Sequence, residues 1–268
     1  MYYLLEIKNR TELSRRPLSE ECYRTVMKGL EATRLLRTVE EEFLCFHEAL
    51  RELEDWCINA PQDAEYLVRN LHTAERLCRG VLFEYKTFLD HTEKLLKKAF
   101  GKESDAAEIF KQGTHDAYDL HPEYAFVYQL RNNMQHFDNI VHSFEASVVK
   151  PYLQPCSIPQ TLLQDDGWKE QEKHYILSAK GNIDLHAAFV ATYNAMEKIM
   201  VPVINYLLKW NDGGANIMML RNWIEPLFTR EDSKFFCLAE TDETNKFIAI
   251  PVYWEIIYRI ADSLNKLQ

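Results

Sequence analysis

The sequence predicts an all-α fold, an elongated helical bundle with two long helices and a small C-terminal β-hairpin. Two observations carry this prediction. The eight glycines and nine prolines make up 17 of the 268 residues, about half of their usual share of roughly 12%, so turns are scarce and elements are long. In the middle of the chain the apolar residues recur every three or four positions, which places them on one face of a helix.

The composition limits the classes of protein to which the chain can belong. With 47% hydrophobic and 27% charged residues, it can bury a core and is not intrinsically disordered. The 31 basic and 41 acidic residues give a net charge of −10, which excludes a polybasic coat for nucleic acid as the main design. The longest nearly apolar run, residues 199–208, is far shorter than the roughly 20 residues of a membrane span.

The N-terminus and the cysteines indicate where the protein resides. The first residues, MYYLLEIKNR, lack the basic segment that precedes the apolar stretch of a secretory signal. We therefore expect a cytoplasmic protein that does not contact a membrane. The six cysteines include no Cys-x-x-Cys pair, so we expect reduced, mostly buried thiols, no structural metal and no cofactor.

Residues 1–58 are expected to form N-terminal helices with a short strand. Residues 1–7 alternate weakly between apolar and polar side chains, which indicates a short edge strand. Ser19 is placed to cap a helix that runs to about residue 37, with glutamates at the positive end of the helix dipole. The spacing from Thr38 to Glu41 is that of a capping box, so either a second helix begins there or one helix continues.

Residues 59–150 are expected to contain the two long helices. The apolar spacing between Pro61 and Phe100 predicts the longest helix, about 60 Å at 1.5 Å per residue. The Gly-punctuated stretch that follows suggests a loop with a short helix at residues 105–111. Pro122 suits the first turn of a helix and Pro151 marks its end, so these prolines frame the second long helix.

Residues 151–268 are expected to form a C-terminal helical extension with a hairpin, packed on the same body. Two short helices separated by a turn at Gly167 are expected between residues 155 and 180. Asp184 can cap a helix that runs to about residue 210. The remaining expected elements are a turn at 211–214, a hairpin of residues 235–240 and 246–250, and a closing helix over 252–267.

The second long helix carries an unusual polar face. A helical wheel gathers tyrosine, amide, imidazole and arginine side chains where a solvated face would carry lysines and glutamates. Such groups make specific hydrogen bonds on partly dehydrated surfaces. The face therefore contacts a ligand or a second copy of the chain, or it is a buried polar seam without chemistry. Its members are Tyr124, Tyr128, Arg131, Asn132, Gln135, His136, Asn139, His142 and Ser143.

Within this face, the sequence RNNMQH from Arg131 to His136 resembles the signature of the HEPN superfamily. That signature is an arginine, a polar residue, three more residues and a histidine on a helix of a helical bundle. Residues 87–102, 130–136 and 162–197 are also similar to HEPN-like prokaryotic proteins with an Arg-Asn-x-x-Gln-His core. On this resemblance, residues 59–150 would be the HEPN-like core.

The resemblance implies a metal-independent endoribonuclease that serves as a toxin or phage-defence effector. His136 would act as the general acid or base, Arg131 would neutralise the charge on the phosphorane, and Asn132 would orient the imidazole or the phosphate. An antitoxin or another regulatory protein is an expected partner, as in toxin–antitoxin pairs. The expected substrate-binding residues, which would contact the RNA, are Gln135, Asn139 and Tyr128.

The active site is expected in the cleft of a homodimer. Arg131 and His136 are about 140° apart on an ideal helix, so one helix alone barely forms a site. Two copies facing each other across a two-fold axis would bring the arginine of one near the histidine of the other. Asp138 stands where some HEPN toxins carry a modified tyrosine, which puts that form of control in doubt.

Two alternatives to the ribonuclease stay open. One is a catalytically silent HEPN-like module that binds RNA, a nucleotide or a protein through the same face, and the other is a purely structural helical dimer. The net charge of −10 repels RNA at long range, so RNA binding would require a local basic patch. The sequence offers Lys94, Lys97, Lys98 and Lys102 for such a patch.

Overall fold

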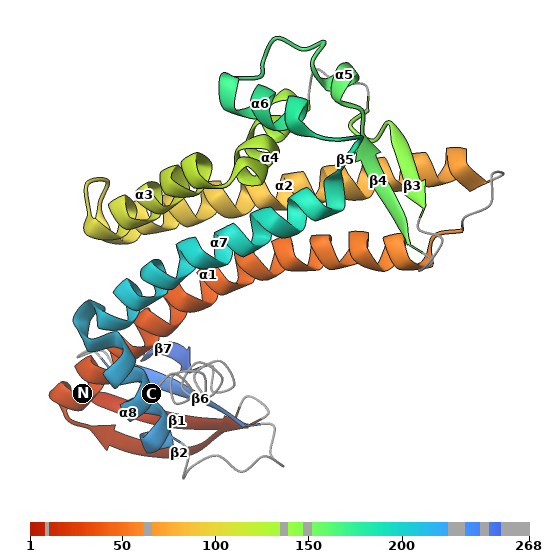
Figure 1. Ribbon diagram of the computed structural model, residues 1–268. Coiled ribbons are helices and arrows are strands. Elements are labelled where there is room, and N and C mark those ends of the chain that lie inside the picture. The colour runs from red at the N-terminus through yellow and green to blue at the C-terminus, as the bar shows by residue number, and fades with distance from the viewer. Residues whose placement is uncertain are drawn as a thin grey trace. The chain divides into compact units, whose positions relative to one another are not determined.

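The computed structural model is mostly helical, with two small antiparallel sheets (Figure 1). It describes residues 1–8, 11–61, 66–134, 139–146, 152–224, 234–241 and 247–252. The chain divides into two compact units: one combines Met1–Val39 with Ile204–Gln268, and the other is Glu40–Val203. A mainly helical fold is therefore confirmed. Over the described residues, none of the helices has the length and apolar character needed to cross a membrane.

The first unit is built on a four-stranded sheet in the order β2-β1-β6-β7. All of its neighbouring strands are antiparallel. The strand predicted at the N-terminus is confirmed, but it is an inner strand and not an edge, because β6 pairs with its second side. The strands are β1 (Tyr2–Lys8), β2 (Thr11–Leu18), β6 (Lys234–Thr241) and β7 (Phe247–Val252).

Strand β2 was not anticipated, because the sequence before Ser19 was interpreted only as the approach to a helix. It contains Pro17, which lacks a backbone N–H and is tolerated because β2 is an edge strand. The C-terminal strands β6 and β7 pair directly with each other. The closing helix expected over residues 252–267 lies outside the described residues, apart from Val252 at the end of β7.

Helix α1 (Glu20–Asn59) is uninterrupted. The Ser19 hydroxyl accepts a hydrogen bond of 3.1 Å from the Cys22 amide, which confirms the predicted cap. Thr38 does not begin a second helix: its hydroxyl donates to the carbonyl of Arg34, four residues earlier, at 3.0 Å. A threonine that bonds in this way sits inside a continuous helix.

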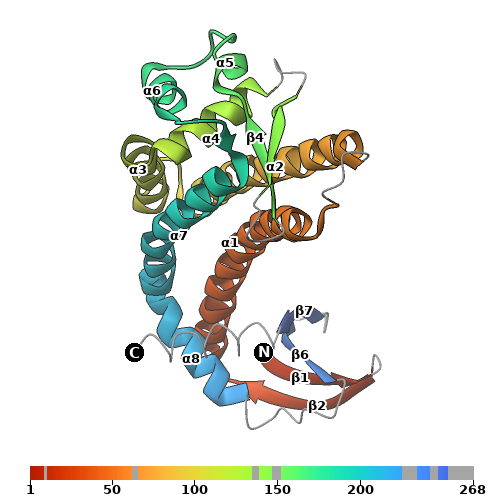
Figure 2. The same cartoon turned by 45° about the vertical axis from the view of Figure 1, so that its right-hand side comes forward.

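The second unit packs the later part of α1 with α2 (Leu67–Phe100), α3 (Asp105–Leu120), α4 (Pro122–Asn133) and α7 (Leu185–Lys209). Figures 1 and 2 show α1 and α7 side by side along this unit. Aromatic rings fill the space between them: Phe43 stacks on Tyr193 with ring centroids 4.9 Å apart. Phe46 meets Tyr85 of α2 at 5.7 Å, and both are fully buried.

The predicted helix α2 is confirmed from Leu67 to Phe100. Helix α3 begins at Asp105 as expected, but it runs to Leu120 and not to 111. The Ser104 hydroxyl accepts from the Ala107 amide at 3.3 Å and caps its first turn. The additional turns of α3 carry polar and aromatic residues that face α2.

The second long helix predicted between Pro122 and Pro151 is wrong, because α4 ends at Asn133. Residues that were assigned to its last turns form strand β3 (Ser143–Ala146), which pairs with β4 (Leu153–Ser157). Strand β4 in turn pairs with β5 (Ile183–Asp184). The backbone amides that would continue the helix, those of Ile140 and Val141, donate instead to the Glu75 carboxylate of α2.

The elements after β4 follow the expected order. Two short helices, α5 (Pro159–Leu162) and α6 (Glu170–Ser178), flank the turn at Gly167. The Asp184 carboxylate accepts from the Ala187 amide at 3.0 Å, which confirms the predicted cap of α7. Beyond α7, Asn211 and Asp212 have positive φ angles, as expected for a turn, but the glycines that follow them begin α8 (Gly213–Ile224).

Candidate functional site

The arginine and asparagine of the HEPN-like motif lie in the last turn of α4. Arg131 is half-buried, and its Nε atom is buried with no hydrogen-bond partner among the described residues. Asn132 is also half-buried. A guanidinium N–H that is removed from water normally has an acceptor, so this arginine has a donor left for another group. Gln135 and His136 lie outside the described residues.

One ion pair on α2 holds the chain within the motif, at Met134, and after the motif, at Ile140 and Val141. The Arg79 guanidinium donates to the carbonyl of Met134 at 3.2 Å. The Glu75 carboxylate accepts from the Ile140 amide at 2.9 Å and from the Val141 amide at 2.8 Å. Arg79 Nε and Glu75 Oε1 are 2.5 Å apart. Met134 and Ile140 are therefore both fixed to residues one turn apart on α2.

The end of α4 is also held by the turn before α6. Gln129 donates through Nε2 to Asn133 Oδ1 and to the carbonyl of Gly167, both at 2.8 Å. A Cβ atom added at Gly167 would lie 2.8 Å from the Asn133 amide group, so a larger residue there would have to displace that side chain. The last turn of α4, which carries Arg131, is thus packed from two sides.

The predicted polar face exists only as far as Asn133. Tyr124 is fully buried, while Tyr128 is half-buried and lines a cavity. Asn139 is exposed and follows the helix instead of belonging to it. His142 is likewise outside the helix: its Nδ1 atom accepts from the Ile158 amide at 3.0 Å, and burial lowers the pKa of its imidazole. The helical wheel therefore misplaces Asn139 and His142, which lie outside α4.

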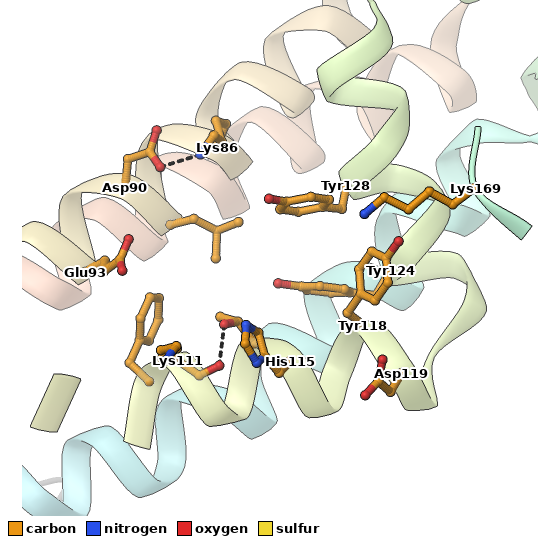
Figure 3. Close-up of a pocket in the computed structure, with 13 residues that line it drawn as sticks. Lys86, Asp90, Glu93, Lys111, His115, Tyr118, Asp119, Tyr124, Tyr128 and Lys169 are labelled. Carbon is orange, nitrogen blue, oxygen red and sulfur yellow. Dashed lines mark hydrogen bonds and ion pairs between the residues drawn. The ribbon is translucent and has the colours of Figure 1, made fainter. Parts of the chain in front are cut away.

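A cavity of about 530 Å³ lies beside the same helix, between α2, α3, α4 and the residue before α6 (Figure 3). Most of its lining is polar or aromatic, with three tyrosines and three lysines. In Figure 3, Tyr128 and Lys169 face Lys86 and Asp90 of α2 across the cavity. Tyr128 was predicted as a substrate-binding residue, and it is the predicted site residue that lines this cavity.

A buried carboxylate sets the position of two lining residues. Glu172 of α6 is fully buried, and it accepts a short hydrogen bond from the Tyr118 hydroxyl. Its second oxygen accepts from the Lys169 amide at 2.9 Å. The Lys169 ammonium then lies 5.5 Å from the centre of the Tyr118 ring, within the range of a cation–π contact. Tyr118 meets Tyr128 edge-on, with centroids 5.8 Å apart.

The lysines of the cavity differ in how they are neutralised. Lys86 forms a short ion pair with Asp90, one turn further along α2. Lys111 approaches the Glu108 carboxylate only loosely, at 3.8 Å. Lys169 has no ion pair with a carboxylate in the part of the chain that the structure describes, and its ammonium lies over the Tyr118 ring. Lys111 and Lys169 are therefore less neutralised than Lys86, and the Asp119 carboxylate of α3 lines the same cavity.

Sequence reasoning missed the cavity because its residues come from four separate segments. One signal was present: Lys111, His115 and Tyr118 follow the four-three spacing of one helix face. The short helix predicted at 105–111 includes Lys111 but stops before His115 and Tyr118. The lysines proposed from the sequence as a basic patch, 94 to 102, do not line the cavity, and one of them, Lys97, pairs with Glu93 at 2.5 Å.

A second group of titratable side chains is buried near the start of α7. The Tyr152 hydroxyl and His186 Nδ1 are 2.7 Å apart, and burial lowers the pKa of His186. Burial also raises the pKa of the neighbouring Cys57 thiol to about 12, so that the thiol stays protonated and unreactive. Among the described residues, no three His, Cys, Asp or Glu side chains converge as metal ligands would. All six cysteines are free.

Comparison with known proteins assigns no relative to the chain: no family model, no curated protein and no solved structure matches it. The proposed function therefore depends on the residues of this chain and their contacts.

Proposed function

We propose that the protein is a metal-independent endoribonuclease of the HEPN type, a toxin or defence effector, with Arg131, Asn132 and His136 in its active site. The observation that carries the proposal is Arg131: its buried Nε atom has no acceptor among the described residues. A phosphate oxygen is the acceptor that a guanidinium binds best, since both charge and planar geometry match. The clamp of Glu75 and Arg79 on Met134 and Ile140 supports it, because catalytic groups need fixed neighbours.

The proposed reaction is an internal transfer at phosphorus. The His136 imidazole takes the proton of a ribose 2′-hydroxyl, and the 2′-oxygen attacks the adjacent phosphorus. The bond from phosphorus to the 5′-oxygen breaks, and the imidazolium returns its proton to that oxygen. Arg131 stabilises the extra negative charge on the pentacoordinate phosphorane. The products are one fragment with a 2′,3′-cyclic phosphate and one with a 5′-hydroxyl.

We propose further that two copies form the active site together. In the proposed dimer, the arginine of one copy and the histidine of the other meet across a two-fold axis. Sedimentation at the concentrations used for cleavage tests this arrangement. A monomer that cleaves RNA would contradict it, and a dimer whose dissociation abolishes cleavage would support it.

The ribonuclease is tested by incubating the full-length protein with transfer RNA in the presence of EDTA. The wild type should release fragments with cyclic phosphate ends, and His136→Ala and Arg131→Ala should lower the rate at least 100-fold. His174→Ala, an exposed histidine of α6, is the matched control and should cleave like the wild type. If the wild type is inactive, or if His136→Ala keeps its activity, the proposal is wrong.

A second candidate is a catalytically silent module that binds RNA or a nucleotide. The cavity beside α4 favours it, because a binding site of this kind needs tyrosines and lysines but no proton-transfer group. The same preparation separates the two candidates. RNA binding by a wild-type protein that never releases fragments would select the silent module.

A further inference from the structure

The cavity between α2, α3 and α4 is lined by aromatic rings, lysines and carboxylates. Tyr118 and Tyr128 contribute aromatic rings, and Lys111 and Lys169 contribute ammonium groups. Its volume of about 530 Å³ is within the range of small-molecule sites, roughly 300–1,000 Å³. The cavity can therefore hold a ligand with both a ring and a negative charge.

Three simple classes of ligand fit this lining poorly. A bare inorganic anion would leave the tyrosine rings uncovered. A wholly apolar ligand would remove the lysine ammonium groups from water without a partner, which costs free energy. A metal ion would need free carboxylates, but Asp90 pairs with Lys86 and Glu93 with Lys97, and no three His, Cys, Asp or Glu side chains of the described residues converge as metal ligands would. A planar ring joined to a phosphate satisfies both surfaces, since the ring stacks on tyrosine and the phosphate meets the lysines.

We propose that this cavity is a binding site for an unpaired nucleotide, with its base against Tyr128 and Tyr118 and its phosphate at Lys169 and Lys111. Lys169 is suited to the phosphate because the buried Glu172 fixes its backbone, while its ammonium lies over the Tyr118 ring and pairs with no carboxylate of the described residues. Lys86 is less available, since it pairs with Asp90.

The position of the cavity connects it with the proposed active site. Tyr128 and Asn132 are four residues apart on α4, so they share a helix face and are separated by about 6 Å along the axis. A role of the cavity as a subsite for the RNA substrate depends on the proposed ribonuclease activity. Nucleotide binding in the cavity does not depend on cleavage, so the two proposals can fail separately.

The test uses the full-length His136→Ala protein, which should bind RNA without cutting it. Titration calorimetry compares 5′-AMP, adenosine, inorganic phosphate and a hexa-adenylate RNA. We expect 5′-AMP to bind at least tenfold more tightly than adenosine or phosphate, because only 5′-AMP meets both surfaces. Equal affinities for 5′-AMP and phosphate, or no binding of either, would overturn the proposal.

Paired substitutions in the same protein locate the binding. Tyr128→Ala should weaken 5′-AMP about tenfold or more, whereas Tyr128→Phe keeps the ring and should stay within about twofold. Lys169→Ala should weaken 5′-AMP and leave adenosine unchanged. Lys198→Ala, an exposed lysine of α7, is the matched control. If Tyr128→Ala does not fold, judged by circular dichroism, Lys169→Ala decides the question; unchanged 5′-AMP affinity in Lys169→Ala overturns the proposal.

Competition and cleavage distinguish the remaining outcomes. If hexa-adenylate displaces 5′-AMP, the cavity receives a nucleotide of RNA; if it does not, the site belongs to a free nucleotide, and the binding proposal still holds. Cleavage by the wild type together with absent 5′-AMP binding would contradict nucleotide binding in the cavity and support the ribonuclease activity. Binding of 5′-AMP without any cleavage would support the cavity and contradict the ribonuclease.

Discussion

At the scale of single residues, the Glu75 carboxylate holds the chain that follows α4. It is 8% exposed, it accepts from the amides of Ile140 and Val141, and it pairs with Arg79. A buried carboxylate needs partners of this kind to offset its lost hydration. Glu75 thus supplies the acceptors for the Ile140 and Val141 amides, which lie outside α4 and do not bond within a helix.

Replacing Glu75 tests this role. Glu75→Ala leaves two buried amides without acceptors and Arg79 without its partner, so we expect a loss of about 3 kcal/mol in the free energy of unfolding. Urea unfolding followed by circular dichroism measures it. The control is Glu93→Gln, which breaks an exposed pair with Lys97 on the same helix and should cost less than 1 kcal/mol. Equal losses in the two variants would contradict the role of Glu75.

One half-buried and one buried histidine, His142 and His186, predict a dependence of stability on pH. Burial lowers the pKa of His142 and of His186 below the ordinary value of 6.5. Below about pH 6.5 the unfolded chain takes up protons at both positions while the folded chain does not. The contribution of these histidines to stability is therefore fully present above that pH. It decreases as the pH falls towards the lower pKa values that the two imidazoles have in the folded state. Protonation would also remove the acceptor that His142 offers to the Ile158 amide.

Unfolding measured at pH 7 and at pH 5.5 tests this sign. The wild type should be less stable at the lower pH, and the double variant His142→Gln, His186→Gln should lose less stability between the two. His72→Gln, an exposed histidine of α2, should keep the wild-type dependence. A double variant with an unchanged dependence would show that other groups cause it.

Part of the candidate site could be predicted from the sequence at this scale. The motif selected Arg131 and Asn132 from residue types and spacing, and both lie together at the end of α4. Tyr128 was selected from the same face and lines the cavity. Asn139 was misplaced, because the prediction extended a helix that ends at Asn133. The amide of Ile140, which follows Asn139, bonds instead to Glu75, 65 residues earlier in the chain. No local pattern around Asn139 contains that information.

At the scale of elements, local chemistry predicted the helix starts well. Ser19 and Asp184 were selected as caps, and both accept a backbone amide of the first helical turn. Such a cap depends on residues within three positions of each other, so the sequence alone displays it. The ends of helices were harder to predict than their starts. Helix α3 continues nine residues beyond the predicted end at 111, because it packs against α2 and α4.

Helix α7 contains a proline that the local rules disfavour. Pro202 lies inside the helix, where it removes one backbone hydrogen bond and clashes with the preceding turn. It is exposed, so its side chain supplies little packing. Removing the proline stabilises the helix, but it also gives the unfolded chain more conformational freedom, which offsets part of that gain. We therefore expect Pro202→Ala to raise the free energy of unfolding by about 2 kcal/mol.

The measurement for Pro202→Ala is urea unfolding, with Val201→Ala as the control. Val201 is exposed on the same helix, and its replacement should change stability by less than about 0.5 kcal/mol. If Pro202→Ala is no more stable than the wild type, α7 would be adapted to the proline, and the local rule would not apply to it.

At the scale of the whole molecule, the sequence could not show that its two ends meet in one sheet. Strands β1 and β6 pair along their full registers although Leu5 and Cys237 are partners from opposite ends of the chain. The alternation of residues 1–7 predicted a strand but not its neighbours, because pairing depends on contacts far apart in sequence. The division at residues 58 and 150 follows chain order, whereas contacts group residues 1–39 with 204–268.

An engineered disulfide tests this topology. Leu5 and Cys237 are direct partners in an antiparallel pair and are both buried, and such partners have Cα atoms about 4.5–5.5 Å apart, within the range that a disulfide spans. Leu5→Cys treated with an oxidant should therefore close a loop through most of the chain and migrate faster on a non-reducing gel. Leu4→Cys is the matched control, because its side chain points to the other face, opposite Leu238. Cross-linking to Cys237 in neither variant, or equally in both, would contradict the register of β1 and β6.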